Sequence, residues 1–236
     1  MDSESERTAP GPLVLKTIGN SCFFISPDGV KQIVVGHTCD EQFEPVIKFY
    51  KHSKAQNGLA LNVAEWRAFY YKDGDIDAEF RRGGYLNDMF YLGTPSKYCE
   101  FRKIIRNKCL VIAERSQSQL KYPREIALQE KTWIHLKTLI RSIDSVVVKA
   151  VDDQRKFQQL FSDICDEIST KCLYLDENNV SKCLDQLSAN SFSEKSQFSS
   201  HDFNIAFVEL KHACRDLIID KVLEGKVGFN FRQSQI

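Results

Sequence analysis

The sequence predicts an α+β fold in which two tandem units, each with four antiparallel strands and one helix, precede an acidic helical region. Three observations lead to this prediction: a repeat that places Trp133 67 positions after Trp66, short β-rich runs that lead into an amphipathic helix in each copy, and a helical pattern after Ala150. We therefore expect a disordered tail over residues 1–12, a first unit over 13–80, a second unit over 85–150 and a helical region over 151–236.

The repeat is clearest around one strand end and the helix that follows it. It comprises Leu59-Ala60-Leu61, Trp66 and Ile76-Asp77 in the first copy, and Ile126-Ala127-Leu128, Trp133 and Ile143-Asp144 in the second. Apolar residues three and four apart form a stripe on each helix, which places both tryptophans in the core. In the first copy Asp73 and Gly74 interrupt the stripe, although Asn62 and Glu65 are spaced as a capping box. We expect this helix to be bent, shortened or packed against more polar groups.

The strands are predicted from short runs of β-branched and aromatic residues that lie between turn residues. The runs lie near residues 23–25, 33–35, 46–50 and 59–61 in the first copy, and near 89–92, 98–105, 109–113 and 126–128 in the second. Such closely spaced runs form antiparallel meanders. Because a unit of about 65 residues has only a marginal core, we expect the two units to pack on one another or on a partner.

The region after Ala150 carries ten basic and fourteen acidic side chains. Its apolar spacing predicts helices near 157–168, 180–187 and 203–218, with a cap near Ser199 or Ser200, an end at Gly225 and a further strand over 227–231. Three roles are open for this region. It packs over the repeats as a third layer, it dimerises or binds a protein partner, or its negative charge competes for a basic groove.

The formal net charge is zero, but residues 97–125 carry eight basic side chains against three acidic ones. Aromatic residues are interleaved with these charges on the predicted sheet. A positive groove and exposed rings are the two features with which proteins hold single-stranded nucleic acid. The alternative is that the charges only solvate a surface.

The sequence contains no motif typical of a zinc site, a nucleophilic enzyme or a phosphate-binding loop. The eight cysteines lack C-x-x-C spacing and predict reduced thiols rather than a zinc site. No nucleophile is spaced to meet one of the five histidines, and Gly83-Gly84 lacks the lysine of a phosphate loop. We therefore expect no enzyme, no metal and no cofactor. An acidic N-terminus, and no run of about 18 apolar residues, predict a soluble intracellular protein, nuclear or cytoplasmic, without a membrane segment.

The second copy resembles the positive cofactor four family of single-stranded-DNA-binding transcriptional coactivators over its whole length. The residues that carry the resemblance are Met89-Phe90-Tyr91-Leu92-Gly93, Arg106-Asn107-Lys108, Ile126-Ala127-Leu128, Trp133, Leu136, Lys137 and Ile143-Asp144. The first copy matches well from Leu59 to Asp77. The resemblance implies strongly curved sheets, two units paired mainly through their helices as a pseudo-dimer within one chain, and concave sheet faces that bind single-stranded nucleic acid.

Carried over by position, the resemblance places Arg106 and Lys108 where the family contacts phosphates, whereas Ile105 and Gln117 fall where it has stacking aromatics. Tyr98, Phe101 and Tyr122 are the candidate replacements. The full predicted site comprises Lys97, Tyr98, Phe101, Arg102, Lys103, Arg106, Lys108, Arg115, Lys121, Tyr122 and Arg124 in the second unit, and Lys48, Tyr50, Lys51 and Lys54 in the first. The first copy lacks the basic turn, since Phe43-Glu44-Pro45 stands in its place.

We therefore predict a non-enzymatic protein that binds single-stranded DNA in replication or transcription. Two tandem copies followed by an acidic helical region favour a viral protein, which would act in the host cell nucleus. One alternative is a dimerising scaffold that has lost nucleic-acid binding, which the missing stacking positions favour. A second alternative is a protein that binds single-stranded RNA.

Overall fold

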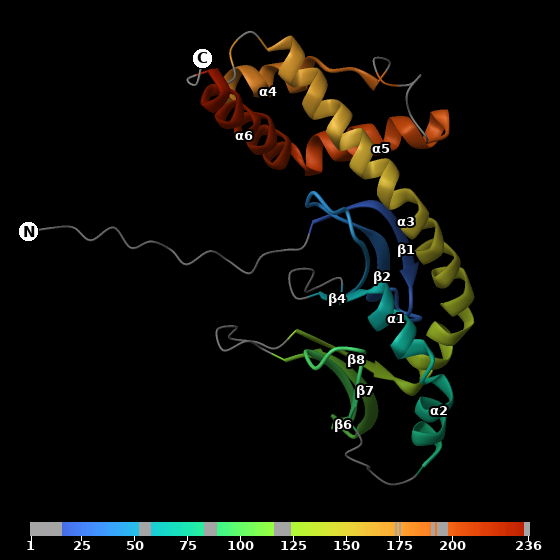
Figure 1. The fold of residues 1–236 in the computed structure, drawn as a ribbon. Coiled ribbons are helices and arrows are strands. Elements are labelled where there is room, and N and C mark those ends of the chain that lie inside the picture. The colour runs from blue at the N-terminus through green and yellow to red at the C-terminus, as the bar shows by residue number, and fades with distance from the viewer. Residues whose placement is uncertain are drawn as a thin grey trace, which may run out of the picture. The chain divides into compact units, whose positions relative to one another are not determined.

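The computed structural model describes residues 16–51, 58–82, 89–115, 124–172, 174, 176–189, 192 and 198–233. These residues form two four-stranded antiparallel sheets followed by a helical region, which confirms the predicted α+β fold (Figure 1). The first sheet has the order β1 (Thr17–Phe24), β2 (Lys31–Thr38), β3 (Pro45–Lys51) and β4 (Leu59–Asn62), and the second has β5 (Phe90–Tyr91), β6 (Lys97–Ile104), β7 (Asn107–Glu114) and β8 (Glu125–Gln129). Both are meanders, as predicted.

The first copy ends in two short helices, α1 (Val63–Tyr70) and α2 (Asp73–Arg81), so the predicted bend is confirmed. The predicted capping box begins α1, because the Asn62 side chain accepts from Glu65 N while Asn62 N donates to Glu65 Oε2, both at 2.8 Å. At the start of α2 the Asp73 side chain accepts from Gly74 N. The residues that interrupt the apolar stripe therefore begin the second helix.

The helices of the C-terminal half are α3 (Glu130–Lys171), α4 (Glu177–Gln186), α5 (Ser200–Ala213) and α6 (Arg215–Gln233). Helix α3 is a single helix of 42 residues that runs through the boundary expected at residue 150, since no proline or glycine interrupts it. The predicted cap at Ser199 is present. The helix end predicted at Gly225 and the strand predicted over 227–231 are wrong. Helix α6 continues through both, although Gly225 and Gly228 each cost a helix about 1 kcal/mol.

The chain forms two compact units that do not follow the two copies of the repeat. Among the described residues, unit 1 comprises 24–33, 48–51, 58–82, 89–115 and 124–139, and therefore joins α1 and α2 to the strands of the second copy. Unit 2 comprises residues 16–23, 34–47 and 140–236, and therefore joins most of α3 to strand segments of the first copy. In each unit a helix of one copy lies with strands of the other.

Both tryptophans lie in the core of unit 1, as predicted. Trp66 and Trp133 are 0% and 1% exposed. The ring of Phe69 from α1 meets Trp133 edge to face at 5.7 Å, and Trp133 Nε1 donates to the Asp77 carboxylate of α2 at 2.7 Å. A helix pair of the first copy is thus joined to the helix of the second by both a ring contact and a hydrogen bond.

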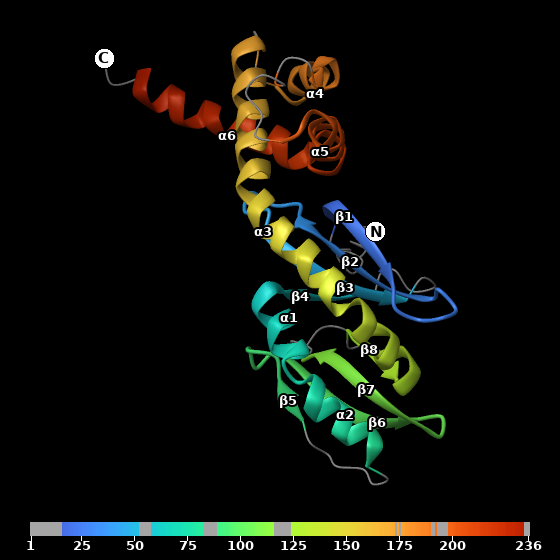
Figure 2. The same cartoon turned by 90° about the vertical axis from the view of Figure 1, so that its right-hand side faces the viewer.

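Unit 2 has a core in which Ile18 and Phe43 pack with apolar residues of α3, α4, α5 and α6. Figure 2 shows α4, α5 and α6 beside the C-terminal part of α3. The backbone carbonyl of Ala150 on α3 is 2.8 Å from Nε2 of the buried His37 on β2. In the described residues the helical region therefore packs on strand segments of the first copy.

Among the helices that the structure describes, none combines the length and the apolar composition that a membrane span requires.

Candidate nucleic-acid interface

The register of strands β6 and β7 divides the predicted basic site between two faces of the second sheet. Cys99 pairs with Ile112 and Phe101 pairs with Leu110, and these four side chains are buried. Directly paired residues share a face and successive residues alternate between faces. Lys97, Phe101 and Lys108 therefore point to the side of these apolar residues, which we call the helix face. Tyr98, Glu100 and Arg102 point to the opposite side, which we call the outer face, although its β7 residues Cys109, Val111 and Ala113 are buried.

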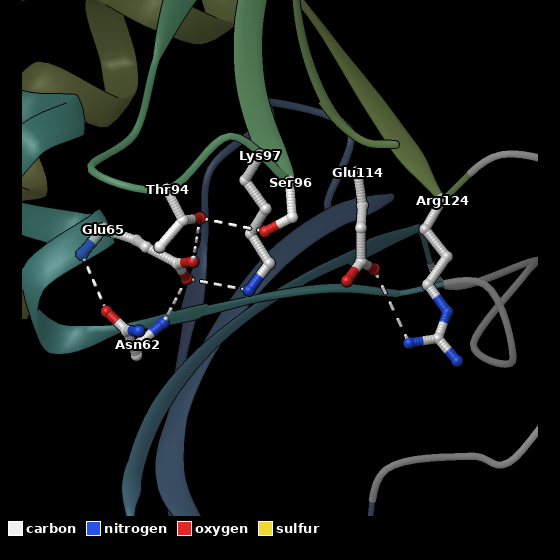
Figure 3. Close-up of polar contacts among 7 residues, drawn as sticks. All are labelled: Asn62, Glu65, Thr94, Ser96, Lys97, Glu114 and Arg124. Atoms are coloured by element: carbon white, nitrogen blue, oxygen red, sulfur yellow. Dashed lines mark hydrogen bonds and ion pairs between the residues drawn. The ribbon is translucent and has the colours of Figure 1, made fainter. Parts of the chain in front are cut away.

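On the helix face, Lys97 belongs to a polar cluster built on Glu65 of α1. Its Nζ is 2.8 Å from Glu65 Oε2, and the hydroxyl of Thr94 donates to Glu65 Oε1 at 3.1 Å (Figure 3). The Lys97 and Glu65 side chains are only 15% and 4% exposed. This pair joins the first helix to the second sheet, so Lys97 is engaged in packing.

Lys108 makes a second contact of the same kind. Its Nζ donates to the side chain and to the backbone carbonyl of Glu79 on α2, both at 2.6 Å, and lies 5.3 Å from the centre of the Phe101 ring. Phe101 is 7% exposed and meets Phe80 edge to face at 5.0 Å. Base stacking requires an exposed ring, and the Phe101 ring is enclosed.

On the outer face, two tyrosines lie side by side. Tyr91 of β5 pairs directly with Tyr98 of β6, which places their Cβ atoms about 5 Å apart. Tyr91 is 48% exposed and Tyr98 is half-buried. The exposed Arg115 donates to the Tyr91 hydroxyl at 2.8 Å, and its guanidinium carbon lies 5.3 Å from the centre of the same ring. Two rings and one cation therefore meet at this end of the sheet.

Two other arginines of the segment, Arg102 and Arg124, are paired with carboxylates. Arg102 contacts Glu100 on its own strand and donates to Glu125 of β8 at 2.7 Å. Arg124 lies 3.7 Å from Glu114 (Figure 3). These glutamates are already counted in the net charge of +5, which Glu65 and Glu79, from outside the segment, reduce further, to +3. The guanidinium of Arg102 must share its donors to hold a phosphate.

The hairpin between β6 and β7 turns on Ile105 and Arg106, both with positive φ, 47° and 69°. Two-residue hairpins of this kind favour Asn-Gly, and a β-branched residue in this backbone region is strained. Ile105 is 89% exposed, and Arg106 and Lys103 are also exposed. The basic turn is thus presented to solvent, about 25 Å along β6 from the tyrosine pair.

The remaining predicted residues lie apart from this strip. Lys48 and Tyr50 share one face of β3, opposite the buried Phe49, and Lys51 is exposed at the strand end. Lys54, Lys121 and Tyr122 lie outside the described residues. The structure adds Tyr91, which sequence reasoning missed. The antiparallel pairing of β5 with β6 is the signal that identifies it.

Comparison with protein-family models and with curated proteins finds no match for this chain. In the part of the chain that the structure describes, no group of three or more histidine, cysteine, aspartate or glutamate side chains is arranged to hold a metal ion.

Proposed function

We propose that this chain binds single-stranded nucleic acid, without catalysis, on the outer face of the second sheet. The observation that carries the proposal is the direct pairing of Tyr91 with Tyr98, with the Arg115 guanidinium against the Tyr91 ring. In this assignment the two tyrosines stack on bases, and Arg115 and Arg102 hold phosphates.

The proposed site has the physical requirements of a sequence-tolerant binder. Every base has a π-face, and each base stacked on an aromatic ring contributes about 1–3 kcal/mol. A guanidinium binds phosphate through paired donors. Because Arg102 already pairs with Glu100 and Glu125, few counterions are released on binding, so we expect a measurable but shallow salt dependence.

Fluorescence anisotropy with labelled single-stranded and duplex oligonucleotides at two salt concentrations tests this function. We expect the single strand to bind more tightly than the duplex, and the Tyr91→Ala/Tyr98→Ala double variant to lose at least about 30-fold in affinity, because two stacked bases contribute at least about 2 kcal/mol. Tyr174→Ala, at an exposed residue between α3 and α4, is the matched control and should bind as the wild type does. The same titrations with DNA and with RNA oligonucleotides show which of the two nucleic acids the chain binds more tightly.

A second candidate, an interaction scaffold, is favoured by the ion pairs on the helix face. Lys97 and Lys108 are both about 15% exposed and paired with Glu65 and Glu79, so these cations join two parts of unit 1. If the double tyrosine variant and the wild type bind the single strand equally weakly, the scaffold replaces nucleic-acid binding as our conclusion. The proposal of a replication or transcription role in a virus depends on the same result.

A further inference from the structure

Two cysteines far apart in the sequence meet in unit 2. Cys39 follows β2, and Cys214 is the residue between α5 and α6. The side chains of Cys39 and Cys214 are hydrogen-bonded to each other. Both cysteines are free in the structure, Cys39 half-buried and Cys214 2% exposed. A half-buried cysteine and a buried one are therefore in contact.

The backbone on both sides of this contact is held in place. Glu41 forms an ion pair with Lys221 of α6, with oxygen–nitrogen distances of 3.0 and 2.9 Å. The carbonyl of Gln42 accepts from the side-chain amides of Gln154 and Gln158 on α3, and the buried Phe43 belongs to the core of unit 2. The loop that carries Cys39 is thus fixed to α3 and α6, and its thiol stays beside Cys214.

The contact between the two thiols shifts their pKa values in opposite directions. The hydrogen bond with Cys214 is the main cause that lowers the pKa of Cys39, and the charge of Lys16 adds to it. The same hydrogen bond, together with burial, raises the pKa of Cys214. Cys39 is also the less buried of the two residues, so an incoming disulfide meets it first. The lowered pKa acts in the same direction, since a thiolate attacks a disulfide whereas a thiol does not.

We propose that Cys39 and Cys214 form a thiol–disulfide exchange site, which accepts a small-molecule disulfide such as oxidised glutathione and ends as an intramolecular disulfide. The Cys39 thiolate attacks one sulfur of oxidised glutathione, forms a mixed disulfide and releases one glutathione thiolate. Cys214 then loses its proton to solvent and attacks Cys39 Sγ, which expels the second glutathione. Two protein thiols are oxidised, one glutathione disulfide is reduced, and the new bond ties the β2–β3 loop to the α5–α6 junction.

A second pair of contacting thiols supplies an internal comparison. Cys172, just after α3, is hydrogen-bonded to Cys183 of α4, but burial first and this contact second raise the pKa of Cys172 to about 12. Its sulfur also lies 3.7 Å from the Asn179 carbonyl oxygen. With so little thiolate at neutral pH, Cys172 should react with the same disulfide more slowly than Cys39.

The test is a peptide map of the full-length, reduced chain after exposure to oxidised glutathione under native conditions. Samples are quenched in acid, alkylated and digested without reductant. We expect a cross-linked peptide that contains Cys39 and Cys214, formed before any modification of Cys172 or of the buried Cys99 and Cys165. If the wild type keeps Cys39 and Cys214 alkylatable, or keeps glutathione on Cys39 without passing it to Cys214, the proposal is wrong.

Two variants separate the steps. Cys214→Ala should accumulate a stable glutathione adduct at Cys39, and Cys39→Ala should leave Cys214 unmodified. Cys172→Ala is the matched control and should form the Cys39–Cys214 cross-link at the wild-type rate. Glutathione attachment to Cys214 in the Cys39→Ala variant would overturn the assigned order. The wild-type map decides the proposal by itself if a variant fails to fold.

Discussion

At the scale of single residues, Glu65 and Glu79 form ion pairs with two lysines of the basic segment and so remove them from the proposed interface. Each receives a lysine from the second sheet, Lys97 and Lys108, in a contact from which water is largely excluded. The sequence shows an excess of positive charge in this segment, but charge counting does not reveal which cations meet carboxylates far away in the chain. The interface proposed here is therefore built from the tyrosines rather than from the lysines.

Lys108→Ala should destabilise the fold by about 3 kcal/mol, because it leaves the buried Glu79 carboxylate without its cation. Arg106→Ala, two residues away on the exposed hairpin, should change the free energy of unfolding by less than about 0.5 kcal/mol. Urea denaturation of the two variants measures both values. Equal stabilities would show that the Lys108–Glu79 contact contributes nothing to the fold.

His37 should make stability depend on pH. Burial lowers its pKa from the ordinary value of 6.5, although Ala150 O, Asp153 and Glu209 act in the opposite direction. The unfolded chain therefore binds a proton more readily, so the stabilisation is complete above pH 6.5 and is lost as the pH falls through the folded pKa. Urea midpoints at about pH 7.5 and about pH 5.5 measure the loss.

The matched variants for this pH effect are His37→Gln and His212→Gln. Glutamine at position 37 removes the titrating group, so the difference between the two midpoints should shrink. His212 is exposed on α5, and its variant should keep the wild-type difference. An unchanged difference in His37→Gln would assign the pH dependence to other groups.

At the scale of elements, local patterns predicted most of the strands and both repeat helices. The apolar stripe around Trp133 predicted a helix, and the interruption at Asp73 and Gly74 predicted the bend between α1 and α2. The sequence did not reveal that α3 continues past Ala150, because the stripes before and after that residue were read as two helices. The prediction for the residues of α6 beyond Gly225 was wrong for a related reason. A glycine and a short run of β-forming residues are weak evidence against a long helix.

Two glycines test the backbone account of these elements. Gly74 lies in α2 without positive φ, and Gly93 follows β5 with φ of 79°, and a Cβ at either position meets nothing within 4 Å. Gly74→Ala should therefore stabilise the fold by about 0.5–1 kcal/mol, and Gly93→Ala should destabilise it by about 1 kcal/mol. Urea midpoints measure both, and shifts of the same sign would contradict the assigned backbone conformations.

At the scale of the whole chain, the duplication produces two compact units in which helices and strands of different copies are joined. An amphipathic stripe predicts that a helix covers a sheet, but it does not identify which of the two sheets, because both have similar apolar faces. The same ambiguity holds for the site. The composition of residues 97–125 predicted that cations and rings lie close together, whereas the β5–β6 and β6–β7 registers place Tyr91 and Tyr98 on the outer face and Lys97 and Lys108 on the helix face.

The most direct measurement is photocross-linking of the full chain to a single-stranded oligonucleotide that carries a halogenated pyrimidine, followed by mapping of the linked peptides. We predict cross-links at Tyr91 or Tyr98, which competing unlabelled single strand removes and competing duplex does not. Cross-links confined to the helical region, or a pattern that survives the Tyr91→Ala/Tyr98→Ala substitution, would contradict the proposal that the paired tyrosines on the outer face bind the strand.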